Sequence, residues 1–195
     1  MTNTINYYNE NAKKYIESTV NVDFHDAQDR FLAFVKEGSH ILDFGCGSGR
    51  DAKYFLDKGY KVSALDGTKE FCEYASNLTG LKVRHMLFNE FEDKDMYDAV
   101  WACASILHCP KDELKSVIAA IRESLHDGGV FYTSFKYSEF EGERNGRHFT
   151  DLTEGSFEKL MNEVGGFELI DQWISLDVRP GRGEEKWLNV ILRKK

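Results

Sequence analysis

The chain has little of what marks linkers, disulfide frameworks and membrane spans. Its 195 residues include only two prolines, so no Pro-rich linker divides it. The four cysteines form no C-x-x-C pair, which predicts free thiols and no metal site. The longest nearly apolar run, residues 99–107, is far shorter than the roughly 20 residues that cross a bilayer. Residues 1–6 carry neither the basic nor the apolar part of a secretory signal, so we expect a cytoplasmic protein with no membrane partner.

The chain is also short of positive charge. It has 25 Lys and Arg against 33 Asp and Glu, which leaves a formal net charge of −8. An acidic chain repels phosphate backbones at long range, and this argues against nucleic acid as a partner. With 42% hydrophobic residues, the length suits one domain with a sizeable core.

Strand and helix patterns alternate along the chain. Short apolar runs predict seven strands, at residues 41–44, 60–65, 83–88, 99–104, 130–135, 167–178 and 186–192. Apolar residues at helical spacing predict helices at 5–17, 24–35 and 50–58 and after Thr68, Pro110 and Thr153, while residues 136–150 are expected to be irregular. This alternation predicts a three-layer α/β sandwich with a mostly parallel sheet. A short Pro-Gly turn joins the last two strands, which should therefore run antiparallel.

The first strand runs directly into a glycine-rich turn and a helix. The turn reads Asp43-Phe44-Gly45-Cys46-Gly47-Ser48-Gly49. Glycines there let backbone amides and a helix N-terminus approach a ligand closely. A dinucleotide fingerprint, G-x-G-x-x-G, would need glycine where Arg50 stands. Asp66 ends the second strand, where a carboxylate can hold ribose hydroxyls.

These motifs resemble the class I S-adenosylmethionine-dependent methyltransferases, which carry D/E-x-G-x-G-x-G after the first strand and an acid after the second. In length and opening the chain is similar to small single-domain bacterial members, including those linked to tellurite resistance. The resemblance implies a Rossmann-like sheet of order 3-2-1-4-5-7-6 with strand 7 antiparallel. It also implies one methyltransferase domain over residues 1–195. Its expected parts are N-terminal lid helices (1–37), a cofactor-binding core (38–135), and an acceptor-side loop, helix and hairpin (136–195).

The resemblance also implies roles for individual residues toward S-adenosylmethionine. The acid that relatives place after the third strand, for the adenine amino group, is replaced here by Leu87. The backbone of Leu87 and Phe88 is then expected to read adenine, with Asn89 or Glu90 as substitutes. The N-terminal helix, with Tyr8 and Tyr15 on one face, is expected to close over the cofactor. The implied cofactor-binding residues are Asp43, Gly45, Cys46, Gly47, Gly49, Asp66, Gly67, Leu87, Phe88, Ala102 and Tyr15.

The loop after the fourth strand should border the methyl acceptor. His108 is a candidate general base there, because its pKa lies near neutrality; the alternative is a packed or helix-capping histidine. Cys103 and Cys109 leave a thiol-bound soft acceptor open, but this needs low-pKa thiols. The Y-x-x-x-K pattern at Tyr132 and Lys136 lies on a strand rather than a helix, so we interpret it as coincidence.

Several cations lie on two loops that leave the carboxyl edge of the sheet. Guanidinium groups suit carboxylate or phosphate oxygens, so these arginines predict an anionic acceptor. Internal salt bridges with interleaved glutamates are the alternative. The candidate acceptor-binding residues are Arg144, Arg147, Arg179 and Arg182.

The sequence thus predicts methyl transfer from S-adenosylmethionine to a small, anionic molecule. Two alternatives stay open, a nicotinamide-dependent oxidoreductase and a non-catalytic protein that binds adenosylmethionine or adenosylhomocysteine. Neither the acceptor atom nor the oligomeric state follows from the sequence.

Overall fold

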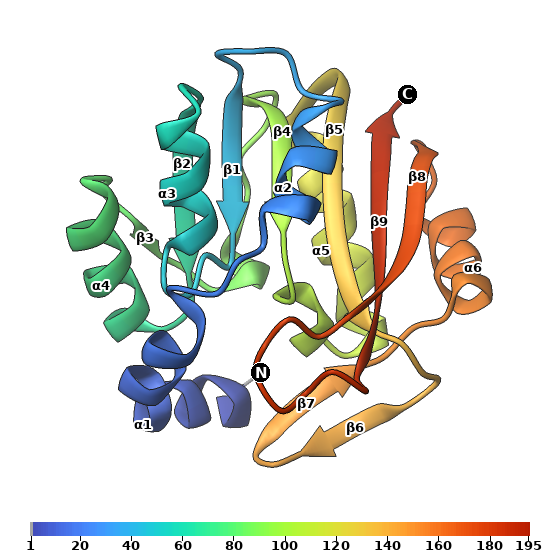
Figure 1. Cartoon of the computed structure of the whole chain (residues 1–195). Helices are drawn as coiled ribbons and strands as arrows, with labels where there is room; N and C mark the ends of the chain where they lie inside the picture. Colours follow the sequence, from blue (N-terminus) through green and yellow to red (C-terminus); the bar gives the residue numbers. More distant parts are fainter. Residues whose placement is uncertain (1) are drawn as a thin grey trace.

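A computed structural model describes residues 2–195 and contains a seven-stranded sheet of order β3-β2-β1-β4-β5-β9-β8 (Figure 1). β9 pairs antiparallel with β5 and β8, and the other neighbours are parallel. This confirms the predicted order, because β8 and β9 are the sixth and seventh predicted strands. The strands are β1 (His40–Phe44), β2 (Lys61–Asp66), β3 (Arg84–His85), β4 (Tyr97–Ala102), β5 (Leu125–Lys136), β8 (Phe167–Leu176) and β9 (Lys186–Lys194).

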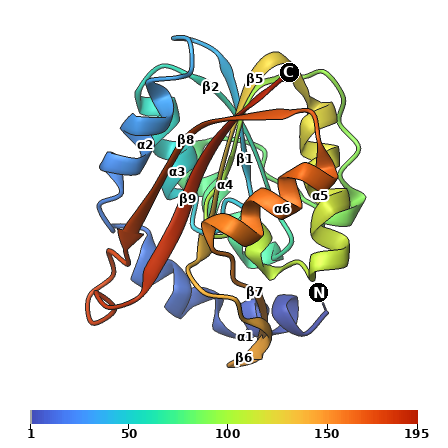
Figure 2. The ribbon, with the colours of Figure 1, turned by 90° about the vertical axis from the view of Figure 1, so that its right-hand side faces the viewer.

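Helices cover both faces of the sheet, as Figure 2 shows with the sheet nearly edge-on. One face carries α2 (His25–Leu32), α3 (Arg50–Asp57) and α4 (Lys69–Thr79). The other carries α5 (Lys111–Ser124) and α6 (Glu154–Val164). α1 (Thr2–Thr19) lies across the carboxyl ends of the parallel strands, at the bottom of Figure 1. None of these helices is long and apolar enough to cross a membrane.

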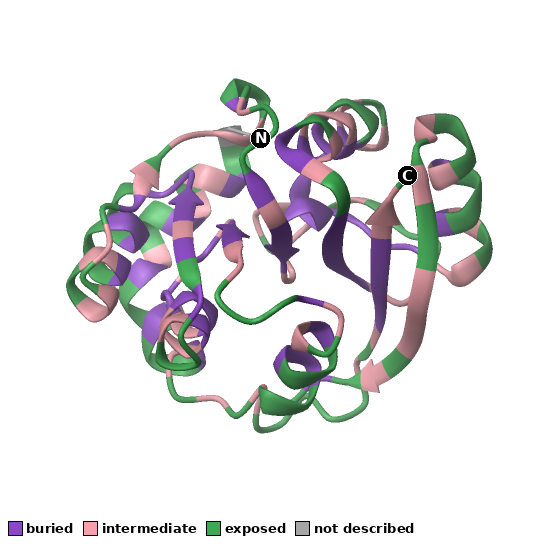
Figure 3. Ribbon diagram, turned by 90° about the horizontal axis from the view of Figure 1, so that it is seen from above, coloured by how far each residue is buried: buried purple, intermediate pink, exposed green. Residues whose placement is uncertain are grey.

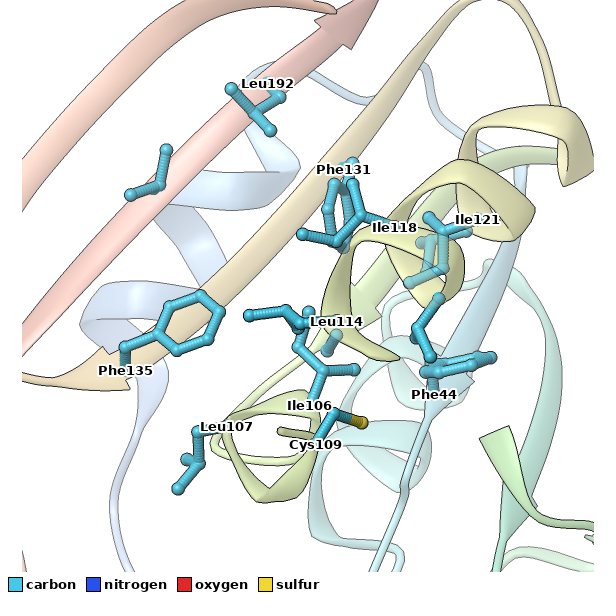
Figure 4. Close-up of a cluster of buried hydrophobic side chains, with 14 of the residues drawn as sticks. Phe44, Ile106, Leu107, Cys109, Leu114, Ile118, Ile121, Phe131, Phe135 and Leu192 are labelled. Carbon is cyan, nitrogen blue, oxygen red and sulfur yellow. The ribbon is translucent and has the colours of Figure 1, made fainter. Parts of the chain in front are cut away.

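Alternation along the central strands divides the core into two clusters. Leu42 and Phe44 of β1 join the cluster under α5 and α6, whereas Ile41 joins the one under α2 and α3. Part of the first cluster is drawn in Figure 4, and the buried central strands appear in Figure 3. Each large side chain buried there contributes roughly 1.5–3 kcal/mol. These two clusters hold the sheet independently of α1, whose buried face forms a third, smaller cluster with Phe71.

The prediction of a third strand over residues 83–88 is mostly wrong. Only Arg84 and His85 pair with β2, and the chain then turns into a short 3₁₀ helix, η1 (Phe88–Glu90). The Glu90 carboxylate accepts a hydrogen bond from the Leu87 amide at 2.8 Å, which closes this turn. A local side-chain bond therefore replaces the strand ladder that apolar residues 83–88 predict.

The stretch predicted as irregular contains a β-hairpin, β6 (Glu141–Arg144) and β7 (Arg147–Thr150). Asn145 and Gly146 connect the strands with φ of +51° and +75°. Positive φ at both central residues is the geometry of a type I′ turn, for which Asn-Gly is a strong signal. The hairpin lies below the sheet beside α1 (Figure 1).

The fifth strand begins earlier than predicted. Leu125 already pairs with Tyr97, and the register then shifts before Val130 pairs with Ala99. The intervening Asp-Gly-Gly segment is therefore an irregularity inside β5 rather than a turn before it.

Candidate active site

A cavity of about 440 Å³ opens at the carboxyl edge of the parallel strands. The glycine-rich turn, α1, the loop after β4, the β6–β7 hairpin and the β8–β9 loop all contribute to its wall. These segments meet at the bottom of Figure 1. Its size and its position beyond the strand ends are typical of small-molecule sites in α/β folds.

The glycine-rich turn exposes backbone to this cavity because no side chain fits there. A Cβ on Gly45 would lie 2.5 Å from the Ser105 Cβ, and both Gly45 and Gly47 have positive φ, of +84° and +52°. The Ser105 hydroxyl donates to the Phe44 carbonyl at 2.6 Å and so ties the loop after β4 to the turn. Close approach of a ligand to this backbone therefore depends on glycine.

Asp66 lies beside this turn at the end of β2 and lines the cavity. Its carboxylate accepts hydrogen bonds from the Gly47 amide at 2.9 Å and the Thr68 amide at 2.8 Å. Burial raises the pKa of Asp66 more than these two hydrogen bonds lower it. The two amides fix the orientation of the carboxylate and leave it further acceptor capacity toward a ligand.

α1 covers the turn from below. A Cβ on Gly67 would lie 2.8 Å from the Ile5 Cδ1, and one on Gly47 would lie 3.5 Å from the Tyr15 ring. The Thr19 hydroxyl donates to the Ser48 hydroxyl at 3.3 Å. Tyr15 and Gly67 both line the cavity, in the region where the sequence analysis expected the helix to close.

Three residues of the expected cofactor set do not line the cavity: Asp43, Gly49 and Ala102. Asp43 is buried and accepts a hydrogen bond from the Ala52 amide at 3.1 Å, so it braces the start of α3. Burial and the nearby Asp51 raise its pKa. A Cβ on Gly49 would lie 2.8 Å from that of Ala75, so this glycine permits α3 and α4 to pack. Ala102 is fully buried, and the cavity begins at the next residue, Cys103.

The expected adenine region is partly in place. Leu87 and Phe88 line the cavity, whereas Asn89 and Glu90 are exposed and do not. The Phe88 ring stacks on Phe44, with centroids 4.6 Å apart. Because the Leu87 amide already bonds Glu90, it is not a spare donor for a ligand.

His108 lies in the 3₁₀ helix η2 (Ile106–His108) and faces the cavity. Its Nδ1 lies 2.7 Å from the His148 carbonyl and its Nε2 lies 2.8 Å from the Tyr8 hydroxyl. Burial lowers the pKa of His108 to about 4, against the opposing effect of the His148 carbonyl. His108 is therefore neutral at physiological pH. Sequence reasoning placed Tyr8 on the lid face but missed its pairing with His108.

All four candidate arginines line the cavity, but three of them face an acid. The partners differ from the interleaved glutamates expected, except for Glu185. The pairs are Arg144 with Asp151 at 2.6 Å, Arg179 with Asp177 at 2.5 Å and Arg182 with Glu185 at 3.8 Å. Two further cavity cations, Lys136 and Arg50, pair with Glu185 and Asp51.

Arg147 differs from these cations, because no carboxylate of residues 2–195 forms an ion pair with it. Its guanidinium lies over the rings of Tyr7, at 4.5 Å, and Phe149, at 5.1 Å. Nη1 donates to the Tyr8 hydroxyl at 3.4 Å, and the buried Nε has no partner. The aromatic rings thus hold an uncompensated positive charge at the cavity wall.

Arg50 was not expected in the site. It lines the cavity and grips Asp51 through Nε at 2.7 Å and Nη2 at 2.9 Å. Asp51 also accepts hydrogen bonds from Gln28 and Trp101. Burial would raise the pKa of Asp51, but Arg50 outweighs it and the pKa is lowered. The position of Arg50 directly after the glycine turn was the available signal.

The thiols and the Y-x-x-x-K pair do not form reactive groups. Burial raises the pKa of Cys103 and of Cys109 to about 12, so neither is a thiolate at neutral pH. The Tyr132 hydroxyl donates to Asn189 inside the core, while Lys136 pairs with Glu185. No group of metal-ligating side chains occurs among the residues that the structure describes.

The glycine cradle and the buried Asp66 fit an adenosyl cofactor. Backbone that a Cβ would obstruct suits the close approach of a ligand, and the oriented carboxylate suits ribose hydroxyls. Asp66 and Arg147 both line this same cavity.

Comparison with known proteins identifies a methyltransferase domain in the chain. Residues 41–129 match the family described as "Methyltransferase domain". An uncharacterized methyltransferase of Staphylococcus carnosus is 25% identical over 154 residues, which cover 71% of this chain and 74% of that protein. Malonyl-[acyl-carrier protein] O-methyltransferase of Salmonella typhimurium is 25% identical over 99 residues, 49% of this chain but only 38% of that enzyme.

Solved structures share the fold. The 1,6-didemethyltoxoflavin-N1-methyltransferase of Burkholderia thailandensis, with bound S-adenosylhomocysteine, superposes with a TM-score of 0.77, 23% identity and coverage of 98% of this chain and 85% of that one. Magnesium protoporphyrin IX methyltransferase of Synechocystis, with bound S-adenosylmethionine, superposes with a TM-score of 0.72 and 16% identity. The superposition covers 98% of this chain and 95% of that one. By its fold and by the domain at residues 41–129, the chain is therefore similar to the class I S-adenosylmethionine-dependent methyltransferases.

Proposed function

We propose that this enzyme transfers the methyl group of S-adenosylmethionine to a small, anionic molecule. The observation that carries the acceptor class is Arg147, the cavity cation that no acid of the described chain neutralises. Arg147 is part-buried and its buried Nε has no partner, so an anionic ligand would supply both a hydrogen-bond acceptor and a counter-charge. A bidentate contact from a guanidinium to a carboxylate or phosphate is also among the stronger hydrogen-bonded interactions.

The chain's own residues have distinct tasks in this proposal. Asp66 and the glycine backbone hold the cofactor, and α1 covers it and excludes water. Arg147 holds the acceptor from the opposite wall. Bound S-adenosylmethionine supplies an electrophilic methyl group. Alignment of two held reactants can lower the barrier by ~7–11 kcal/mol, so positioning is the main contribution of the site.

The proposal also includes the domain organisation and the remaining cofactor and acceptor residues expected from the sequence. It treats residues 1–195 as one methyltransferase domain. In its support, the cavity wall draws on the N-terminal helix, the core and the C-terminal segment alike.

An acceptor panel with an Arg147 variant tests the proposal. Formation of S-adenosylhomocysteine is measured with carboxylates, phosphates and their neutral esters or amides. We expect turnover of anionic members only, and Arg147→Met should raise the acceptor KM about 10- to 100-fold, the value of one charged hydrogen-bonded contact. Affinity for S-adenosylhomocysteine should stay within about twofold, because Asp66 and Arg147 share no hydrogen-bond partner.

Arg30→Met is the matched control, since Arg30 pairs with Asp171 on the surface and does not line the cavity. If the wild type methylates neutral acceptors, and Arg147→Met does not change that turnover, the acceptor is not an anion held by Arg147. Failure of the wild type to form S-adenosylhomocysteine from any acceptor would favour a non-catalytic binding protein.

A further inference from the structure

Two side chains that lie far apart in the sequence meet at the wall of the cavity beside Arg147. Tyr8 comes from α1 and His108 from η2, one hundred residues later, and their Oη and Nε2 atoms lie 2.8 Å apart. Both line the cavity and both are largely buried. The rings also pack edge to face, with centroids 5.5 Å apart. This pair is thus a defined contact rather than a chance surface encounter.

The hydrogen bonds around the pair have a fixed direction. A carbonyl oxygen only accepts, so His108 Nδ1 must carry the proton that it donates to the His148 carbonyl. Nε2 of the neutral ring then holds a lone pair, and the Tyr8 hydroxyl donates to it. Arg147 Nη1 donates to the Tyr8 oxygen in turn. One lone pair of that oxygen remains available to a ligand in the cavity.

Burial and nearby charges keep the Tyr8 hydroxyl protonated and the His108 ring neutral, as the direction of these hydrogen bonds requires. Burial raises the pKa of Tyr8, and Tyr15 and Asp66 add to that effect while Arg147 opposes it. Burial lowers the pKa of His108, and Arg147, His148 and Lys136 lower it further. Tyr8 therefore keeps its proton and His108 Nε2 stays unprotonated at neutral pH.

The geometry points to Tyr8 and His108 as the proton-accepting pair for a hydroxyl group, on an acceptor whose anionic group lies on Arg147. This inference rests on the proposed function and adds the acceptor atom to it. As the acceptor oxygen bonds to the methyl carbon, the methyl–sulfur bond breaks and its electron pair stays on sulfur. The hydroxyl proton of the acceptor passes to Tyr8 Oη while the Tyr8 proton passes to His108 Nε2, which leaves an imidazolium and a neutral methyl ether.

The chemistry of the pair favours oxygen over amine nitrogen. A hydroxyl oxygen that gains a methyl group becomes strongly acidic, so even a weakly basic imidazole takes its proton. An alkyl ammonium is a much weaker acid and would not yield its proton to the same ring. Since Arg147 Nη1 lies only 3.4 Å from Tyr8 Oη, one small molecule can contact both. The acceptor class is therefore a small hydroxy acid.

Binding to the protein loaded with S-adenosylhomocysteine tests this class without turnover. Isothermal calorimetry compares 2- and 3-hydroxybenzoate with benzoate and with 3-(aminomethyl)benzoate, an alkyl amine. We expect at least one hydroxybenzoate to bind about 10-fold more tightly than benzoate, the value of one hydrogen bond of about 1.4 kcal/mol. Tyr8→Phe should reduce that preference to within about twofold and leave benzoate affinity unchanged. Tyr74→Phe, on the exposed face of α4, is the matched control.

Turnover gives the second measurement. With the preferred hydroxybenzoate, Tyr8→Phe and His108→Gln should each lower kcat by about 10²–10⁴-fold, the usual contribution of a positioned acid or base. The KM for S-adenosylmethionine should not change. Nitrogen NMR of the wild type should show His108 neutral with the proton on Nδ1, a result that does not depend on any variant folding.

The inference is overturned by the absence of a hydroxyl preference in the wild type or by a preference that survives Tyr8→Phe. Methylation of 3-(aminomethyl)benzoate alone would also overturn it. A protonated Nε2 in the free protein at pH 7 overturns it as well. If S-adenosylhomocysteine binds but the hydroxyl preference is absent, only this inference fails. If S-adenosylhomocysteine does not bind, the proposed function fails with it.

Discussion

Buried carboxylates beside the cavity have different neighbours and therefore different tasks. Asp66 is oriented by two backbone amides and faces the cavity, whereas Asp43 is turned toward α3. Asp51 neutralises Arg50, and Asp177 neutralises Arg179. Of these four acids, only Asp66 combines an unpaired charge with a place on the cavity wall.

Asp66→Ala should weaken binding of S-adenosylmethionine by about 1.5–3 kcal/mol, the value of hydrogen bonds to a charged group, which is roughly 10- to 100-fold in affinity. Calorimetry on the folded variant measures this directly. Glu73→Ala, on the solvent side of α4, serves as the control. Unchanged affinity in Asp66→Ala would show that this carboxylate only supports the turn.

The arginines on the β8–β9 loop need a different interpretation from the one that the sequence suggests. With no acid between them, Arg179 and Arg182 appear in sequence as unpaired cations whose joint removal leaves stability untouched. The structure contradicts this, because Asp177 lies two residues before Arg179 and its side chain is only 3% exposed. Removing Arg179 leaves a buried carboxylate without its partner.

We expect Arg179→Ala to lower the free energy of unfolding by about 1–3 kcal/mol at neutral pH. Burial would raise the pKa of Asp177, but the hydrogen bonds from Arg179 outweigh it and the folded-state pKa is lowered. A lowered carboxyl pKa stabilises the fold above the ordinary value near 3.8 and loses that effect as pH falls through the lowered value. Urea unfolding at pH 7 and at pH 3 should therefore show the difference shrinking in acid. Arg182→Ala should change stability by less than about 0.5 kcal/mol, and an equal loss in both variants would count against a specific Asp177 pair.

At the scale of elements, α1 and the β6–β7 hairpin build the lower wall of the cavity together. The Thr4 hydroxyl accepts a hydrogen bond from the His148 amide at 3.0 Å, and Tyr8 contacts both Arg147 and His108. The N-terminal helix therefore contributes Tyr8 to the same wall as Arg147 and His108, which under the proposed function is the acceptor side.

Deleting residues 1–18 should leave the sheet folded, because neither of the two large core clusters draws on α1. The retained chain should lose affinity for S-adenosylhomocysteine, since Tyr15 and Ile5 no longer close the glycine turn. Far-ultraviolet circular dichroism and calorimetry measure the two outcomes separately. If the shortened chain fails to fold, α1 belongs to the core and the lid assignment is wrong.

At the scale of the whole molecule, the acidic chain places several cations around one cavity. Six Lys and Arg side chains line it, although the net charge is −8. Five of them pair with four acids of the described residues, because Glu185 contacts both Lys136 and Arg182, so the cavity is weakly positive. This arrangement suits a small anion better than a polyanion, whose binding requires many phosphate contacts.

Ligand-induced stability separates the two cofactor classes for the whole chain. A ligand at 100 times its Kd stabilises the native state by about 2.7 kcal/mol, which for a chain of this size is roughly 5–10 °C in Tm. We expect S-adenosylhomocysteine to produce this shift and NAD to produce none. A shift with NAD alone would restore the oxidoreductase alternative.

The sheet order is implied by the resemblance that the motifs carry. The sequence by itself determines most of the strands and helices, the glycine turn and the place of Asp66 at the end of β2. These features follow from local requirements: apolar periodicity selects strands and helices, and Gly45 needs its positive φ regardless of distant residues. The hairpin also had a local signal, Asn145-Gly146, which a fuller interpretation of turn residues would have used. The short third strand had none, because its loss depends on how Glu90 turns back onto Leu87.

Only the tertiary structure decides which charged and hydrogen-bonding side chains remain unpaired and available to a ligand. Arg144 and Arg147 are three residues apart and indistinguishable by type, yet one meets Asp151 and the other meets only aromatic rings and Tyr8. Tyr8 and His108 meet because α1 folds back across the carboxyl edge. Side-chain pairing depends on distances between elements, and residue type and spacing in the chain carry no such distances. That is why the glycine turn and the place of Asp66 are predictable from sequence, whereas the pairing of the arginines and of Tyr8 with His108 is not.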